Sequence, residues 1–185
     1  PVEPDTILSI QQTGARVLKD ASQTFFLQKE TDADFCLYSP RKFLGVPDGG
    51  ILVSHLPLPS VIHLKNPPLE WWQKAFYAVL KRKEFDQGLP VTQEEWFQLS
   101  QEAEQTAPKG FYRMSDITIM ILHYLNSYQE IAQKRCQNYQ FLAKKLNEIA
   151  MFPDLKNNIA PLGFPITTSL REKIRQALFS KKIYP

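Results

Sequence analysis

The spacing of apolar positions changes from one segment of the chain to the next. Residues 5–12 carry apolar side chains at helical spacing and end before Gly14, a residue type that favours helix termination. Three short apolar runs follow, at 15–20, 34–39 and 51–54, and each is typical of a strand. A helix followed by strands with longer connections between them predicts an α/β fold.

A proline-rich segment separates this region from a set of predicted helices. Four prolines fall within residues 55–68, which predicts a linker. An apolar stripe then predicts a helix that runs from Leu69 to the neighbourhood of Asp86. Thr92 is followed three residues later by a glutamate, and this capping-box pattern predicts the start of a second helix.

The longest predicted element is a single uninterrupted helix. Ser115 is the expected N-cap, and one apolar stripe continues as far as Ile149, which is about nine turns at roughly 3.6 residues each. A helix of this length is expected to form a spine between subdomains or subunits. A strand at 159–167, a helix at 169–180 and the start of a strand at 182–184 complete the prediction.

Composition and charge exclude several classes of protein. The 185 residues are 43% hydrophobic and 22% charged, and the net charge of +3 is spread along the chain rather than gathered into the basic stripe of a nucleic-acid-binding protein. Cys36 and Cys136 indicate a reducing compartment, and no apolar run could span a membrane. His55, His63 and His123 lack metal-ligand spacing. We therefore expect a cytoplasmic protein with no metal, nucleic-acid or membrane partner.

Candidate chemistry is concentrated in residues 39–50, SPRKFLGVPDGG. Ser39 follows a predicted strand and Lys42 comes three residues later, and ligands of open α/β sheets gather at the carboxyl ends of strands. A lysine amine can form a Schiff base with an aldehyde cofactor, and the neighbouring Arg41 adds a charge that favours the reactive neutral amine. A serine hydroxyl can hold a phosphate. Taken alone, the Arg-Lys pair is more often simply a solvated pair in a loop.

An acidic residue is predicted at the same edge of the sheet. Asp20 ends the first predicted strand, so its carboxylate is expected near Lys42. A carboxylate that faces a pyridine nitrogen keeps that ring protonated and makes it an electron sink. Taken alone, Asp20 is more often a helix cap or a turn residue, and Gln23 is an ordinary polar residue.

Together these segments resemble the pyridoxal-phosphate-dependent aminotransferases of the DegT/DnrJ/EryC1/StrS group, which are sugar aminotransferases. The family's strand that ends in an acidic residue is similar to GARVLKDASQTFF, at 14–26. Its Schiff-base segment resembles DFCLYSPRKFLGVPDGGILVS, at 34–54, and its Tyr-Arg-Met-Ser segment and long helix resemble the sequence at 110–146. The resemblance covers nearly the whole chain.

The resemblance implies a fold as well as a family. That fold is the PLP-dependent transferase fold type I, of the aspartate aminotransferase kind, and the chain would hold the end of the large domain and most of the small C-terminal domain of a longer protein. Residues 1–62 would belong to the PLP-binding large domain, 63–114 to a helical connecting segment, and 115–185 to the long helix and the small α/β domain. A homodimer is implied as well.

Residue roles are also implied by the resemblance. Lys42 would bind pyridoxal 5'-phosphate and carry the proton at the substrate's α carbon, Asp20 would pair with the pyridine nitrogen, and Gln23 would contact the phenolic oxygen. Ser39 would hold the phosphate. Arg113 would lie near the cofactor phosphate or a substrate diphosphate, across a dimer interface. The implied reaction transfers an amino group, with glutamate as donor, to a nucleotide-linked keto sugar.

Two other functions stay open. Phe111 stands where family members often have Asn, Lys19 stands where an acidic residue is usual, and extra aromatic helices occupy 69–105. These departures favour a non-catalytic dimerisation or interaction module that retains the fold. The other alternative is a dehydratase of the same fold, whose usual signature is a histidine in place of the Schiff-base lysine; Lys42 does not match it.

Overall fold

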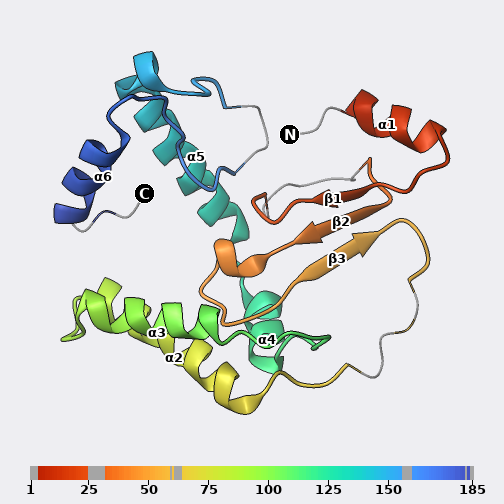
Figure 1. Ribbon diagram of the computed structural model, residues 1–185, viewed down its shortest axis with the longest axis horizontal. Coiled ribbons are helices and arrows are strands. Elements are labelled where there is room, and N and C mark those ends of the chain that lie inside the picture. Colours follow the sequence, from red (N-terminus) through yellow and green to blue (C-terminus); the bar gives the residue numbers. More distant parts are fainter. Residues whose placement is uncertain are drawn as a thin grey trace. The chain divides into compact units, whose positions relative to one another are not determined.

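The computed structural model describes residues 4–24, 32–58, 60, 64–155, 160–181 and 183, and Figure 1 gives their arrangement. The chain divides into two compact units, Pro1–Tyr128 and Gln129–Pro185. The elements in chain order are α1 (Pro4–Gln12), β1 (Leu18–Asp20), β2 (Phe35–Tyr38), the 3-10 turn η1 (Pro40–Lys42), β3 (Ile51–Ser54), α2 (Leu69–Asp86), α3 (Gln93–Gln105), α4 (Asp116–Tyr124), α5 (Tyr128–Lys145), the 3-10 turn η2 (Asn147–Ile149) and α6 (Arg171–Ser180).

The first unit contains a three-stranded mixed sheet in the order β1-β2-β3. β1 pairs with β2 in parallel, with Asp20 opposite Leu37, whereas β2 and β3 are antiparallel, with Tyr38 opposite Ile51. The strands predicted at 34–39 and 51–54 are therefore confirmed, and the first strand is shorter than predicted because it begins only at Leu18. The parallel pair places the carboxyl ends of β1 and β2 at one edge of the sheet.

A buried carboxylate fastens α1 to this sheet. Asp34, directly before β2, is 9% exposed. It accepts hydrogen bonds from the Val17 amide at 2.8 Å, Arg16 Nη1 at 3.0 Å and Gln11 Nε2 at 3.2 Å. The helix ends as predicted before Gly14, whose φ of +84° suits glycine better than any other residue.

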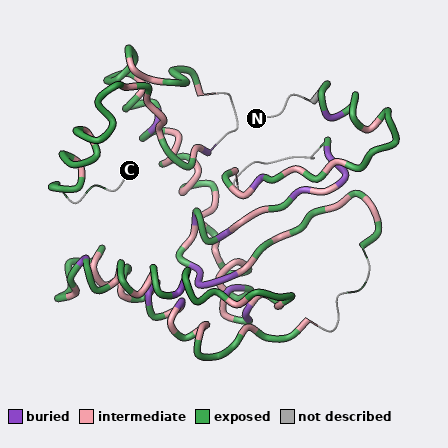
Figure 2. Tube along the Cα trace, viewed as in Figure 1, coloured by how far each residue is buried: buried purple, intermediate pink, exposed green. Residues whose placement is uncertain are grey.

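The helices predicted after the linker are confirmed as the antiparallel pair α2 and α3. Ala75 and Ala78 of α2 and Ala103 of α3 are buried (buried residues are purple in Figure 2). The Trp71 indole N–H donates to the Ala103 carbonyl at 2.7 Å. Thr92 caps α3, because its hydroxyl accepts the Glu95 amide at 3.2 Å, as the capping-box pattern predicts.

The prediction of one continuous helix from Ser115 to Ile149 is wrong. Ser115 caps α4 as expected, but the helix stops at Tyr124, and Leu125 has an extended backbone with ψ of 102°. In a continuous helix the Leu122 carbonyl would accept the amide four residues later. It accepts the Tyr128 hydroxyl instead, at 2.7 Å. The break falls next to an Asn-Ser pair, residue types that compete with the helix for backbone hydrogen bonds.

The second unit packs the segment after η2 against α5. Tyr139 is buried, donates to the Phe152 carbonyl at 2.6 Å, and lies edge-on to the Phe164 ring at 4.9 Å between centroids. The helix predicted at 169–180 is confirmed as α6. In the described part of the predicted strand at 159–167 there is one antiparallel bridge, Ala150 to Ile166.

Two further predictions concern a strand near the end of the sequence and the absence of a membrane-spanning helix. Of the strand predicted to start at 182–184, residues 182 and 184 lie outside them. Among the helices that are described, none combines the length and the apolar character that crossing a membrane requires.

Candidate functional site

The candidate site lies at the carboxyl edge of the parallel strands. Asp20 is the last residue of β1, and Lys42 is the last residue of η1, which follows β2 after a single intervening residue. The Ala21 amide donates to the Leu37 carbonyl at 2.8 Å, so the chain beyond Asp20 stays beside β2 before it turns. This route brings the turn after β1 and the turn after β2 to the same place.

One serine joins the two predicted site residues. Asp20 Oδ1 accepts the Ser22 amide at 2.9 Å, and Lys42 Nζ donates to Ser22 Oγ at 3.3 Å. The Ser22 amide and hydroxyl lower the pKa of Asp20, and the positive charge of Lys42 adds to the effect. The carboxylate is therefore ionised at neutral pH. Asp20, Ser22 and Lys42 form what we call the sheet-edge cluster.

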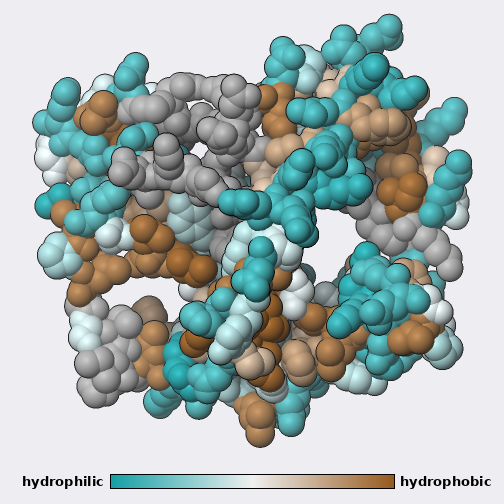
Figure 3. Space-filling model, turned by 180° about the vertical axis from the view of Figure 1, so that it is seen from behind, coloured by the Kyte–Doolittle hydropathy of each residue, from teal (hydrophilic) through white to brown (hydrophobic). Residues whose placement is uncertain are grey.

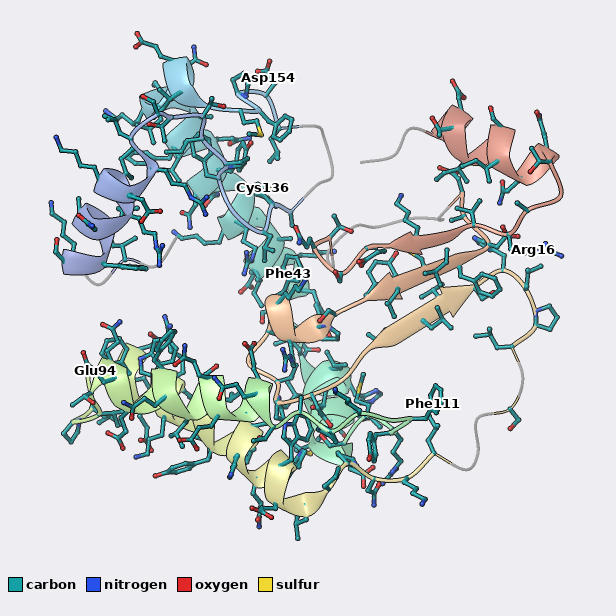
Figure 4. All side chains as sticks on the ribbon, in the orientation of Figure 1. Arg16, Phe43, Glu94, Phe111, Cys136 and Asp154 are labelled. Carbon is teal, nitrogen blue, oxygen red and sulfur yellow. The ribbon has the colours of Figure 1, made fainter. Side chains whose placement is uncertain are left out.

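The next two predicted residues flank this cluster. Gln23 is exposed in the turn directly after Ser22. Ser39 is half-buried at the N-cap position, directly before η1, and its carbonyl accepts the Lys42 amide at 3.3 Å. Its hydroxyl makes no capping bond to that turn. Phe43, which follows Lys42 and is buried, holds the end of η1 in place (Figure 4).

Arg113 belongs to a different set of contacts. Its amide donates to the Lys65 carbonyl at 2.9 Å, next to a bridge between Lys65 and Tyr112. Its guanidinium donates to the Asn66 side chain and, at 3.0 Å, to Asp116 in the first turn of α4. The structure thus brings Asp20 and Lys42 together, whereas Arg113 is held by the segment before α2 and by α4.

A buried carboxylate that sequence reasoning missed links these two regions. Asp48 is 6% exposed, and it accepts the Ser115 amide at 2.9 Å and the Ser115 hydroxyl at 2.7 Å. The hydroxyl of Thr118, which is fully buried, also donates to Asp48. We call these three residues the buried carboxylate cluster. It fastens the loop after Lys42 to the start of α4, directly beside Arg113.

Gly49 completes this junction. Its φ is +105°, and a Cβ at this position would lie 2.7 Å from Met114 Cε. The chain therefore needs glycine here both for its backbone conformation and for the close approach of Met114. The sequence held a signal for the junction, because Asp48 and Gly49 lie in the candidate segment and Ser115 is a predicted N-cap, but their pairing depends on the tertiary fold.

The residues at the sheet edge fit a pyridoxal group. Lys42 is exposed, so its amine is accessible, and Asp20 is an ionised carboxylate bonded to the same serine. An accessible amine and a fixed carboxylate are the two groups that such a cofactor requires of its protein. For metals, no set of three or more His, Cys, Asp or Glu side chains suits an ion anywhere in the described part of the chain.

Comparison with known proteins identifies no relative. No family model matches the chain, and no match was found among curated proteins or solved structures. The described residues contain a three-stranded sheet and six helices, a mixed α/β content that does not show a fold type I transferase. No family is shown for this chain.

Proposed function

We propose that the chain is the C-terminal part of a pyridoxal-phosphate-dependent aminotransferase of fold type I, with a nucleotide-linked keto sugar as acceptor and glutamate as amino donor. The observation that supports this proposal is the sheet-edge cluster, in which Lys42 Nζ and the Asp20 carboxylate bond to the same serine. The acceptor and donor classes rest on the resemblance of the segments at 14–26, 34–54 and 110–146.

Each residue of the site has a defined task in this proposal. When bound, pyridoxal phosphate supplies an electron-withdrawing ring. Asp20 binds the ring nitrogen and, because its pKa is lowered, stays ionised and keeps a proton there. Lys42 binds the cofactor aldehyde and carries a proton at the substrate's α carbon. Gln23 donates to the phenolic oxygen, and Ser39 donates to the phosphate.

Lys42 must leave Ser22 to do this work. The distance of 3.3 Å between Lys42 Nζ and Ser22 Oγ is long for a charge-assisted hydrogen bond, and Lys42 is exposed. The contact is therefore weak, and the flexible lysine stem can exchange it for a cofactor. Asp20, in contrast, is held by a backbone amide and keeps its place when Lys42 moves.

A homodimer is part of the proposal because α4 is apolar on more than one side. Ile117 and Ile121 are half-buried, while Met120 is 53% and Tyr124 is 72% exposed. A helix that is apolar all round is normally buried. Phe111, on the loop before α4, is also uncovered, at 90% exposed (Figure 4). Arg113, on the same loop, is then the residue that contacts a phosphate of the partner's site.

The test is covalent labelling of Lys42. The chain is incubated with pyridoxal phosphate, reduced with borohydride, and digested for mass spectrometry. We expect the label on the peptide that contains Lys42 and its loss from that position in Lys42→Ala. The matched control is Lys109→Ala, which removes an exposed loop lysine and leaves the labelling at position 42 unchanged. Labelling spread evenly over the exposed lysines would contradict the proposal.

The same experiment distinguishes the aminotransferase from the non-catalytic alternative. A dimerisation module that only retains the fold has no reason to react preferentially at Lys42. Sedimentation of the unlabelled chain gives its oligomeric state, so a dimer without selective labelling favours that module, whereas selective labelling favours the aminotransferase.

A further inference from the structure

A cavity of about 510 Å³ lies between α2 and α3 on one side and η1 with the loop after it on the other. Its floor contains the buried alanines Ala75, Ala78 and Ala103, together with Val46. This volume is in the range of pockets that bind small molecules. The cavity belongs to the first unit, and none of the three residues of the sheet-edge cluster lines it.

One wall of the cavity is a fixed indole. Trp96 lines the cavity, and the Arg82 guanidinium carbon lies 4.3 Å from the centre of the Trp96 ring. Arg82 Nε also lies 2.9 Å from each Asp86 carboxylate oxygen. Because Arg82 is held by Asp86, it keeps the indole in one orientation. An indole wall and an alanine floor favour a flat apolar ligand, which can pack against the part of the ring that Arg82 leaves uncovered.

Five charged residues line the cavity, namely Arg41, Arg82, Lys83, Asp86 and Glu104, and the ion pair of Arg41 is longer than that of Arg82. The Arg41 guanidinium pairs with Glu104 at 3.5 Å, compared with the 2.9 Å bonds of Arg82. The Glu104 side chain is 66% exposed, so water can solvate it when the pair separates. A pair this long and this exposed contributes little. A ligand carboxylate in the cavity can therefore replace Glu104 and form two parallel bonds with Arg41.

We propose that this cavity binds a small aromatic carboxylate, with its ring against Trp96 and its carboxylate on Arg41. The apolar floor and the indole select the ring, and the weakly paired guanidinium selects the charge. This site is independent of the function proposed for Lys42, because it uses neither that amine nor a pyridoxal cofactor.

The test uses two probes that differ in charge but hardly in shape, naphthalene-2-carboxylate and naphthalene-2-carboxamide. The chain is labelled at its alanine methyl groups and titrated with each probe by NMR. We expect the carboxylate to shift the methyl signals of Ala75, Ala78 and Ala103, and to bind about tenfold more tightly than the amide because it makes a charge-assisted pair.

Two arginine variants locate the source of that preference. Arg41→Gln is expected to reduce carboxylate affinity to that of the amide and to leave amide affinity unchanged. Arg175→Gln is the matched control, because Arg175 also pairs with a glutamate at 3.5 Å and lies over an aromatic ring, but on α6. It is expected to preserve the tenfold preference.

A filled cavity provides the second check. Ala78→Leu places a larger side chain into the floor and is expected to abolish binding of both probes. If Ala78→Leu does not fold, the comparison of Arg41→Gln with Arg175→Gln still tests whether Arg41 binds the carboxylate. Alanine methyl signals that stay unmoved by the carboxylate, or equal affinities of the unaltered chain for the two probes, would overturn the proposal.

Discussion

The sheet-edge cluster and the buried carboxylate cluster use similar groups in opposite ways. Each contains an aspartate whose carboxylate accepts a serine amide at 2.9 Å. Asp20 is exposed and its serine also contacts a lysine, whereas Asp48 is 6% exposed and collects two hydroxyls in addition. The first arrangement leaves an amine and a carboxylate accessible to a ligand, and the second uses every bond to join two segments.

The two aspartates differ in how many buried hydrogen-bond donors would lose their acceptor if the carboxylate were removed. A buried donor that loses its acceptor costs the full desolvation penalty, while an exposed donor finds water. Stability should therefore depend on Asp48, and ligand chemistry should depend on Asp20 and Lys42. Each of the following changes is a way to break that division of roles.

The largest effect is expected for Asp48→Ala. This change removes the Asp48 acceptor from the Ser115 amide and hydroxyl and from the Thr118 hydroxyl, all in a buried place. The Ser115 hydroxyl keeps Thr118 Oγ1 as an acceptor at 3.2 Å. We expect the free energy of unfolding to fall by about 3 kcal/mol, measured by urea denaturation. The control is Asp116→Ala, whose carboxylate is 77% exposed and pairs only with Arg113 among the described residues. Its loss should cost less than about 1 kcal/mol, and equal losses in the two variants would show that Asp48 is not structural.

A smaller effect is expected for Asp34, because its carboxylate is buried like that of Asp48 but one of its partners is exposed. It is 9% exposed, but one of its partners, Arg16, has a side chain that is 67% exposed. The Val17 amide, the Gln11 side chain and Arg16 lower the pKa of Asp34 from 3.8. Its contribution to stability is therefore present above that value and lost as the pH falls through the lower pKa of the folded state.

The measurement for Asp34 is the unfolding temperature as a function of pH. Between about pH 5 and pH 2 the unaltered chain should lose stability, and Asp34→Asn should lose less because its side chain does not titrate. Asp20, whose pKa is also lowered, contributes to the remaining slope. Asp154→Asn, which removes a carboxylate of the second unit, is measured beside it for comparison. If the unfolding temperature of Asp34→Asn depends on pH as strongly as that of the unaltered chain, Asp34 does not cause the loss of stability in acid.

Local elements were predictable from the sequence where the signal is local. The Thr92 cap and the stop at Gly14 each depend on a few neighbouring residues, and the structure has both. The single helix through residues 115–149 was wrong because an apolar stripe continues in phase across the break. In the structure the interruption is seen in the extended backbone of Leu125 and in the Tyr128 hydroxyl, which donates to a backbone carbonyl of α4.

The candidate site was predictable only in part for a similar reason. The nearness of Asp20 and Lys42 follows from the general rule that strand ends gather at one edge of a sheet. Ser22 and Asp48 were missed because each looks like an ordinary loop residue until its partners are known. Those partners are 20 positions away for Ser22 and 67 to 70 positions away for Asp48, and no local pattern encodes such distances.

The smallest effect, and the sharpest test of the exposed cluster, is the titration of Asp20 itself. Ser22→Ala removes the hydroxyl but keeps the amide, and Lys42→Met removes the positive charge together with the hydrogen bond to Ser22 Oγ. The hydroxyl lowers the pKa of Asp20 more than Lys42 does, and the amide lowers it most. We therefore expect the pKa of Asp20 to rise in both variants, more in Ser22→Ala, and to stay below its usual value in each. Carboxyl NMR signals followed against pH measure this order. A larger rise of the Asp20 pKa in Lys42→Met would contradict this order. It would show that the charge of Lys42 acts on Asp20 directly rather than through the shared serine, with the amine closer to Asp20 than the sheet-edge cluster requires.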